Sequence, residues 1–288
     1  MAFGKNIRTF YDGAWHDGDQ MVMRAGDHGL WQGSNVFDGA RLFDGLVPDL
    51  EGHCARLNRS AEALMITPTV DPDHMVDIVR EGLRPYGNDR AVYIRPMYWC
   101  INGSELGVAP APNSTGFAIC LEEVAMPPAE AMTTLTTTSF RRPVLADNVC
   151  DAKAGCLYPN NARMLVEAQR KGFGNALVQD ALGNVAETAS ANVWMVKDGE
   201  YFTPIANGTF LSGLTRKRHM LNLRADGYTV HEAVLTLDDF RTADEVFLTG
   251  NFSKVQGVSA FDDVSYAYGS YTRKARELYM DWAQTCPM

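Results

Sequence analysis

Two adjacent prolines, Pro127 and Pro128, interrupt the sequence near its middle and set the strongest limit on how the chain folds. Proline has no backbone N–H and continues neither a helix nor a central strand, so regular structure ends on both sides of this pair. A chain of 288 residues is also longer than a single core supports efficiently. We therefore predict two domains, residues 1–125 and 133–288, joined by a linker at 126–132.

The residues before the linker predict antiparallel strands covered by helices. Turn residues at 11–13 and 43–45 follow short apolar runs, as in tight hairpins. Apolar residues repeat at helical spacing through 50–64, and a second helix is expected after Pro72. The segment 91–100 is typical of a strand. Helices on one face of an antiparallel sheet define an α+β domain.

The residues after the linker mix both kinds of element. Proline near a helix start and glycine after a helix end mark the expected helices, and Gly-containing turns mark the hairpins. We expect strands at 133–139 and 245–249, helices at 159–171 and 215–225, and hairpin turns at 182–184 and 197–199.

Composition excludes several classes of partner. The net charge of −9 and the lack of a run of basic residues argue against nucleic acid. Six scattered cysteines, without a Cys-x-x-Cys pair, suggest neither a disulfide framework nor a metal site. No apolar segment is long enough for a signal peptide core or a membrane span. We expect a cytoplasmic protein with no metal and no membrane partner.

Lys153 is the lysine that the sequence singles out for chemistry. Nucleotide-binding, zinc-protease and nucleophile-elbow motifs do not occur. Lysine is scarce, and Lys153 lies between Ala152 and Ala154-Gly155, where little side-chain bulk covers it. The alternative is an ordinary exposed lysine, since lysine is almost never fully buried.

A set of short motifs, in order along most of the chain, resembles the fold-type IV pyridoxal-phosphate enzymes and, among them, the branched-chain aminotransferases. Each motif alone is weak, and their order and spacing carry the resemblance. The motifs are Asp27-His28-Gly29, Val36-Phe37-Asp38-Gly39 with Arg41, Arg56-Leu57, Tyr93-Ile94-Arg95-Pro96, Leu106-Gly107-Val108, Lys153-Ala154-Gly155 with Tyr158, Val185-Ala186-Glu187 with Asn192, Ser212-Gly213-Leu214-Thr215-Arg216, and Ala243-Asp244-Glu245-Val246-Phe247-Leu248-Thr249-Gly250.

The resemblance implies an α+β fold with a small α+β domain, a larger pseudo-barrel α/β domain, and an active site at the domain and dimer interface. It implies pyridoxal 5′-phosphate (PLP) as cofactor and Lys153 as the catalytic residue that forms a Schiff base with it. An amine suits this role because it is a nucleophile when neutral and carries a proton afterwards. A homodimer or higher homo-oligomer is also implied, because the family's counterpart of 106–108 enters the partner's site.

Further cofactor contacts follow from the same resemblance. Glu187 matches the carboxylate that faces the pyridine nitrogen, where a negative charge keeps that nitrogen protonated. Tyr158 resembles the tyrosine that donates to the phenolic oxygen. An arginine and backbone N–H groups at a helix start suit the phosphate. The residues expected there are Arg56, Leu214, Thr215, Gly250 and Asn251.

Substrate residues are expected on two strands and a loop. Alternation along 36–43 and 92–97 places one set of side chains on a common face of each strand. Tyr93 and Arg95, with Arg41 behind them, resemble the arrangement that binds the substrate α-carboxylate. The apolar pocket is expected to involve Phe37, Leu106, Val108 and Phe252.

Three residues depart from the family pattern. Gln32 stands where branched-chain enzymes usually have an aromatic residue, and Asn251-Phe252 stands where threonine and alanine are usual. Asn251 still donates hydrogen bonds, whereas Phe252 adds bulk near the substrate.

We therefore expect a transaminase that moves the amino group of an L-amino acid, branched-chain or otherwise apolar, to 2-oxoglutarate. The departures from the pattern keep a D-amino acid or (R)-amine transaminase open. A 4-amino-4-deoxychorismate lyase of the same fold type and a homologue without turnover also stay open.

Overall fold

The computed structural model describes residues 4–288, which divide into two compact units. Unit 1 comprises the described residues up to Met126 together with Ala152–Cys156 and Ala283–Met288, and unit 2 comprises Pro127–Asp151 and Leu157–Trp282. The main division falls within the expected linker. Residues 1–3 of the expected first domain lie outside the described residues.

Two segments belong to unit 1 although the sequence-based boundaries placed them in the second domain. Ala154 forms an antiparallel bridge with Val36, which ties 152–156 to the first sheet. The backbone N–H of Val47 donates to the carbonyl oxygen of Cys286 at 2.8 Å, which ties the C-terminal residues to the same unit. These contacts join residues far apart in the sequence, so local patterns do not report them.

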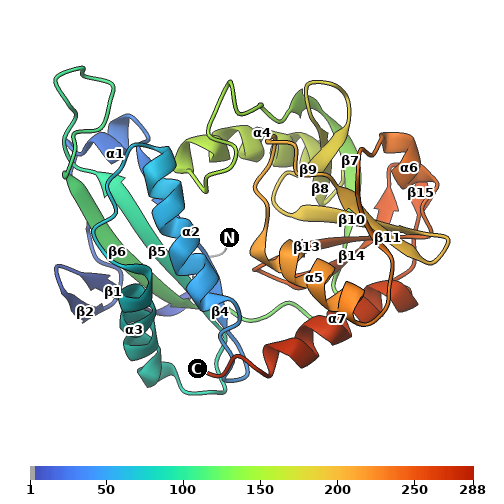
Figure 1. Ribbon diagram of the computed structural model, residues 1–288, viewed down its shortest axis with the longest axis horizontal. Helices are drawn as coiled ribbons and strands as arrows, with labels where there is room; N and C mark the ends of the chain where they lie inside the picture. The colour runs from blue at the N-terminus through green and yellow to red at the C-terminus, as the bar shows by residue number, and fades with distance from the viewer. Residues whose placement is uncertain (1–3) are drawn as a thin grey trace. The chain divides into compact units, whose positions relative to one another are not determined.

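Unit 1 is a six-stranded antiparallel sheet in the order β2-β1-β6-β5-β3, with β4 also paired to β5. Helix α2 contacts β5 and β3, and α3 contacts β6, so the two long helices cover one face (Figure 1). The elements are β1 Lys5–Tyr11, β2 Ala14–Asp17, α1 His28–Trp31, β3 Asn35–Phe37, β4 Ala40–Leu42, α2 Leu50–Ala63, α3 Pro72–Leu83, β5 Val92–Cys100 and β6 Thr115–Glu123.

Local sequence accounts for several boundaries in unit 1. Asp12 and Gly13, at φ 53° and 76°, form the turn that joins β1 to β2. Asp71 caps α3 by accepting from the N–H of Asp73 at 2.9 Å, and Pro72 opens the helix.

The expected single strand over 36–43 is wrong, because β3 and β4 are separated at Asp38 and Gly39. Gly39 lies directly against the hydroxyl of Tyr93, where any Cβ atom would clash. The pairing is interrupted opposite Pro96 of β5, which accepts from the N–H of Asp38 at 3.0 Å but has no N–H to donate in return.

Unit 2 is built on a nine-stranded mixed sheet in the order β12-β11-β10-β13-β14-β7-β8-β9, with β15 paired to β14. Strand β9, at one end of this order, also contacts β10 and β11, so the sheet curls on itself. The elements are β7 Met132–Arg141, α4 Tyr158–Arg170, β8 Asn175–Gln179, β9 Val185–Thr188, β10 Asn192–Lys197, β11 Glu200–Pro204, α5 Leu214–Ala225, β12 Val230–Ala233, α6 Leu237–Arg241, β13 Glu245–Gly250, β14 Lys254–Phe261, β15 Val264–Ser265 and α7 Ser270–Ala283.

Strand β10 shows how this sheet divides the core of unit 2. Val193 and Met195 join an apolar cluster with Phe240 of α6, whereas Trp194 on the opposite face packs in a cluster with Leu223 of α5. Both faces of the strand are buried, because alternate side chains point to opposite sides of the sheet.

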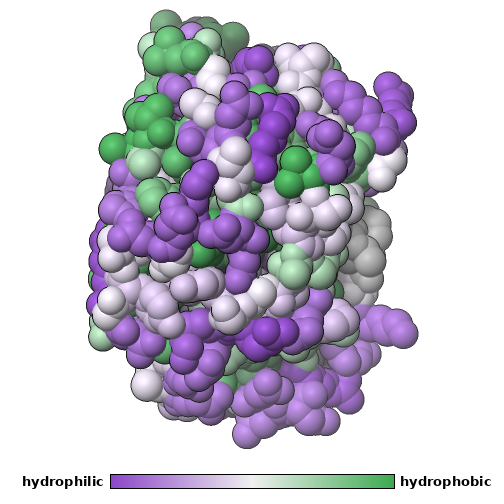
Figure 2. All heavy atoms as spheres, turned by 90° about the vertical axis from the view of Figure 1, so that its right-hand side faces the viewer, coloured by the Kyte–Doolittle hydropathy of each residue, from purple (hydrophilic) through white to green (hydrophobic). Residues whose placement is uncertain are grey.

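The surface of unit 2 that Figure 2 shows is mainly hydrophilic, and its apolar residues form separate small groups. Within residues 4–288, no helix combines the length and hydropathy needed to cross a lipid bilayer. The same residues contain no cluster of three or more His, Cys, Asp or Glu side chains arranged to hold a metal ion.

Candidate active site

Lys153 lies beside Phe37 in unit 1. Its Nζ atom is 4.8 Å from the centroid of the Phe37 ring. The backbone fixes this neighbourhood, since the N–H of Phe37 donates to the carbonyl oxygen of Lys153 at 3.1 Å. The N–H of Lys153 donates to Ser60 Oγ on α2 at 3.0 Å. The structure thus brings the expected catalytic lysine to an expected substrate residue.

Arg56, expected at the phosphate, is almost fully buried on α2 and is held by Asp38. Its Nε and Nη2 atoms donate to the two carboxylate oxygens of Asp38 at 2.7 and 2.8 Å. The Nδ1 atom of His53 lies 2.7 Å from the same carboxylate. Burial acts to raise the pKa of Asp38, but the Arg56 guanidinium and the His53 imidazole together hold it well below its usual range.

Asp38 and His53 were not among the expected site residues. Asp38 was noted only as part of a motif, and it lies between β3 and β4. A fully buried aspartate next to an arginine is the feature that identifies the pair, and burial is known only from the structure.

Arg41, Tyr93 and Arg95 come together on β4 and β5. Arg41 pairs in register with Tyr93, and the guanidinium of Arg95 lies 5.2 Å from the centroid of the Tyr93 ring. Arg95 also forms an ion pair with Glu122, a partner that sequence analysis did not identify.

Arg41 is fully buried, and one of its nitrogens donates to the carbonyl oxygens of Val124 and Ala125, the latter at 3.1 Å. Burial lowers its pKa to about 10, while the nearby Tyr93 acts to raise it. Arg41 therefore binds the segment that follows β6, in addition to pairing with Tyr93 across the strands.

Leu106 and Val108 lie on a surface hairpin of unit 1. The hairpin is closed by a bridge between Gly103 and Pro110. The two apolar side chains are 80% and 73% exposed. Gln32, at the end of α1, is exposed as well. Within unit 1, Leu106 and Val108 thus present apolar surface outward rather than lining the interior.

Glu187 lies on β9 of unit 2, with 8% of its surface exposed. Its carboxylate forms an ion pair with Arg142 at 3.0 Å and accepts from Asn192 Nδ2 at 3.1 Å. Arg142 also donates to Asn161 and to the carbonyl oxygen of Thr188, at 2.6 and 2.7 Å. Sequence analysis did not identify Arg142, which lies outside the motifs.

The remaining expected phosphate residues of unit 2 lie at the start of α5 and at the β13–β14 hairpin. Gly213 precedes α5, and no side chain caps the N–H groups of its first turn, which includes Leu214 and Thr215. Gly250 ends β13 and is followed by Asn251. Asn192 links these segments to Glu187, because it also donates to the carbonyl oxygen of Leu211 at 3.1 Å and pairs in register with Thr249.

Two aromatic site residues of unit 2 are exposed. Phe252 follows Asn251 in the hairpin and is 42% exposed, and Tyr158 begins α4 and is 38% exposed. Their orientation toward any ligand stays a prediction.

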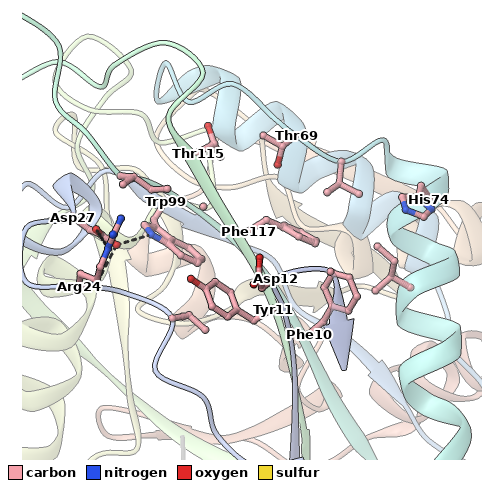
Figure 3. A pocket seen from close by; sticks show the side chains of 16 residues that line it. Phe10, Tyr11, Asp12, Arg24, Asp27, Thr69, His74, Trp99, Thr115 and Phe117 are labelled. Atoms are coloured by element: carbon pink, nitrogen blue, oxygen red, sulfur yellow. Dashed lines mark hydrogen bonds and ion pairs between the residues drawn. The ribbon is translucent and has the colours of Figure 1, made fainter. Parts of the chain in front are cut away.

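A cavity of about 460 Å³ in unit 1 contains none of these residues. Figure 3 shows its aromatic side chains, among them Tyr11, Trp99 and Phe117. Asp27 at its edge accepts from Trp99 Nε1 at 3.1 Å and pairs with Arg24 at 3.4 Å. The candidate site is therefore defined by the chemistry of its side chains and not by this cavity.

Comparisons with known proteins bear on this set of residues. The family model described as amino-transferase class IV matches residues 35–261. A putative branched-chain-amino-acid aminotransferase from Methanocaldococcus jannaschii is 31% identical over 281 residues, covering 96% of each chain.

Solved structures agree with the sequence comparison. An aminotransferase from Brucella abortus bound to the cofactor PLP has a TM-score of 0.96 and 52% identity, covering 97% of this chain and 100% of its own. A branched-chain aminotransferase from the thermophilic archaeon Thermoproteus uzoniensis, with norvaline, has a TM-score of 0.88 and 24% identity, covering 97% and 95%. A further branched-chain amino acid aminotransferase, complexed with N-(5′-phosphopyridoxyl)-L-glutamate, has a TM-score of 0.89 and 28% identity, covering 98% and 95%.

Proposed function

The chain belongs to the class IV aminotransferases, and from this premise we propose that it uses PLP to transfer the amino group of an L-amino acid to 2-oxoglutarate. We propose a donor with a branched-chain or otherwise apolar side chain. The observation that carries the proposal is the position of Lys153, fixed through its backbone on α2 and β3 and adjacent to the Phe37 ring. The similar enzyme complexed with a phosphopyridoxyl-glutamate supports glutamate and 2-oxoglutarate as one substrate pair.

The donor set of the chain fits PLP. Unit 1 offers an amine, Lys153, and a guanidinium, Arg56, that Asp38 holds in place. Unit 2 offers the uncapped N–H groups at the start of α5, an amide nitrogen on Asn251 that is buried without a partner among the described residues, and the carboxylate of Glu187. PLP, when bound, supplies an aldehyde that binds amines covalently and a ring that takes up electrons from the substrate.

The residues then have separate tasks. Lys153 Nζ carries the proton between the substrate α-carbon and the cofactor, first as base and then as acid. The Glu187 carboxylate, fixed by Arg142 and Asn192, holds a proton at the pyridine nitrogen. The phosphate is assigned to Arg56, Leu214, Thr215, Gly250 and Asn251, and the phenolic oxygen to Tyr158.

The substrate carboxylate is assigned to Arg95 and Tyr93, with Arg41 supporting them from the paired strand. Arginine suits a carboxylate because its planar nitrogens donate in pairs. Phe37 is assigned to the apolar side-chain pocket, together with Leu106, Val108 and Phe252.

A homodimer is proposed because the loop with Leu106 and Val108 presents apolar side chains to the outside of unit 1. Trp31, 61% exposed, adds to this surface, since its ring contacts His28, which lies against Gly103 of the loop. Exposed apolar groups of this size mark interaction sites. Size-exclusion chromatography with light scattering should give twice the 31.8 kDa chain mass. Leu106→Ser with Val108→Ser should shift the protein toward monomer, and an unchanged dimer would place the interface elsewhere.

The activity is tested by single half-reactions. The protein loaded with PLP is mixed with one amine at a time, and the absorbance band of the lysine-bound cofactor is followed as pyridoxamine phosphate forms. Loss of the band with L-leucine, L-isoleucine or L-valine, and its return with 2-oxoglutarate, would support the proposal. Response only to D-amino acids or to (R)-1-phenylethylamine would replace it with the transaminase of different specificity that Gln32, Asn251 and Phe252 motivate. Pyruvate release from 4-amino-4-deoxychorismate without an acceptor would identify a lyase.

A further inference from the structure

Lys254 of unit 2 is a fully buried lysine to which the proposed function gives no role. Lys254 opens β14 and is 1% exposed. Its Nζ atom donates to Asn251 Oδ1 at 2.6 Å and lies 5.7 Å from the centroid of the Tyr279 ring. Lysine is rarely buried, because the desolvation of its amine is costly. The burial of Lys254 therefore indicates a role other than packing.

The backbone at Lys254 strengthens this point. Strands β13 and β14 form a hairpin in which Gly250 pairs with Lys254 across a loop of three residues. Lys254 adopts φ 63°, in the left-handed region that glycine usually occupies at the end of such loops. Its side chain is retained here at the expense of backbone strain, which is typical of functional positions.

The hydrogen bond with Lys254 decides how the side chain of Asn251 is oriented. A lysine amine only donates, so the oxygen of the Asn251 amide must face it, and the amide nitrogen must point the other way. That nitrogen, Nδ2, is buried and has no hydrogen-bond partner within the part of the chain that the structure describes. Buried donors are normally paired, so Nδ2 is a donor that lacks its acceptor.

The neighbourhood indicates which acceptor this is. Asn251 directly follows Gly250 at the end of β13, and α5 packs against β13. Through Asn192, the end of β13 is also linked to the segment before the uncapped start of α5. An acceptor among donors of this kind is an anion.

We infer that Lys254 is a positioning residue that orients Asn251 so that Nδ2 donates to the phosphate of the cofactor, an inference that rests on the proposed PLP-dependent function. Lys254 acts through Asn251 and not by contact with the phosphate. The pair replaces the threonine that branched-chain enzymes usually have at position 251.

The test compares PLP with pyridoxal, which lacks the phosphate. Full-length protein freed of cofactor is titrated with each ligand, and the dissociation constants are measured from the absorbance of the bound form. Lys254→Met removes the amine, and Asn251→Asp keeps a partner for Lys254 but has no amide donor. Lys274→Met is the matched control, because it removes a lysine from α7 that pairs with Glu277 at the surface.

Lys254→Met is expected to raise the Kd for PLP about tenfold or more, as for loss of one hydrogen bond to a charged group, and to change the Kd for pyridoxal less than about twofold. Asn251→Asp should raise the PLP constant further, because its carboxylate repels phosphate, and Lys274→Met should leave both constants unchanged. In the double variant Lys254→Met with Asn251→Ala, the loss should equal that of Asn251→Ala alone.

Equal losses for both ligands, or no change for PLP, would overturn the inference. A higher KM for the amino acid at unchanged PLP affinity would also overturn it, because Asn251 would then serve the substrate carboxylate. If Lys254→Met does not fold, the test uses Asn251→Asp. A ratio of the Kd for PLP to the Kd for pyridoxal that equals the ratio of the parent would then overturn the inference. A parent protein that binds no PLP would instead contradict the proposed function itself.

Discussion

Each unit holds a buried arginine–carboxylate pair among the candidate site residues, and the two pairs differ in how accessible their partners are. In unit 1, Asp38 is fully enclosed and Arg56 keeps 10% side-chain exposure. In unit 2, the partners Arg142 and Glu187 are almost equally buried, with 8% and 10% of their side chains exposed. In unit 1 the arginine is therefore the more accessible partner, whereas in unit 2 the arginine and the carboxylate are accessible to about the same extent.

The difference lies in what surrounds each carboxylate. Asp38 accepts from Arg56 and Gly39 and faces His53, and its charge is compensated only inside the protein. Glu187 accepts from the neutral amide of Asn192, and Arg142 has two further acceptors of its own. Loss of the charge on Asp38 is thus expected to lower the free energy of unfolding strongly. Loss of the charge on Glu187 is expected to leave the fold intact and to lower the rate of catalysis instead.

Replacement of Lys153, which belongs to neither pair, should have the largest effect on activity. Lys153→Ala should lower kcat by at least about 1,000-fold, because the group proposed to carry the proton is lost. The absorbance band of the lysine-bound cofactor should disappear, while the circular dichroism spectrum and the oligomeric state stay as in the parent. Turnover at the parent rate would remove Lys153 from the mechanism.

Asp38→Asn should be the most destabilising of these changes. It leaves the buried Arg56 without its counter-charge, which should lower the free energy of unfolding by about 3–5 kcal/mol. Urea titration measures this directly. The control is Asp238→Asn, which breaks the exposed pair with Arg241 and should change the free energy by less than about 1 kcal/mol. Equal losses of unfolding free energy in the two variants would contradict the expectation that the buried pair stabilises the fold more than the exposed pair.

Glu187→Gln should act on rate rather than on stability. Glutamine keeps one of the two acceptor oxygens, and Arg142 keeps Asn161 and the Thr188 carbonyl as acceptors. The fold and bound cofactor should therefore be retained, but the negative charge is lost. We expect kcat to fall by about 100-fold, the size seen when one preorganised electrostatic contact is removed. Stopped-flow half-reactions measure this. A variant as fast as the parent would show that Glu187 does not serve the pyridine nitrogen.

The smallest effect concerns acid stability. The native pKa of Asp38 lies below its unfolded value, so the native state binds fewer protons and the stabilisation is complete above the ordinary carboxyl range. It is lost as the pH falls toward the native pKa. Between about pH 4 and pH 3, the parent should lose up to about 1.4 kcal/mol per pH unit more than Asp38→Asn. Parallel pH profiles of the two proteins would contradict this assignment.

Elements with strong local patterns could be predicted from the sequence. The turn at Asp12-Gly13, the helix that follows Asp71-Pro72 and the turn at Asp198-Gly199 depend on backbone preferences of the residues themselves. Helix α7, Ser270–Ala283, was not predicted, and the expected strand at 36–43 is divided opposite Pro96 of β5, a residue that is distant in the sequence.

The candidate site shows the same limit. Lys153, Arg56 and Glu187 were identified by motifs, and motifs also gave their expected roles. Asp38 as the support of Arg56, Arg142 as the partner of Glu187, and Lys254 as the partner of Asn251 were not identified. Each of these contacts depends on burial and on the direction of a side chain.

By itself, the sequence determined the family, the two-part organisation and the residues proposed to carry the chemistry, because these depend on local preference and on the order of motifs. Only the tertiary structure decided that Lys153 belongs with the sheet of unit 1, and which buried groups hold Arg56, Glu187 and Asn251. The physical reason is that the energy of a charge or a donor depends on what surrounds it, and its neighbours come from distant parts of the chain.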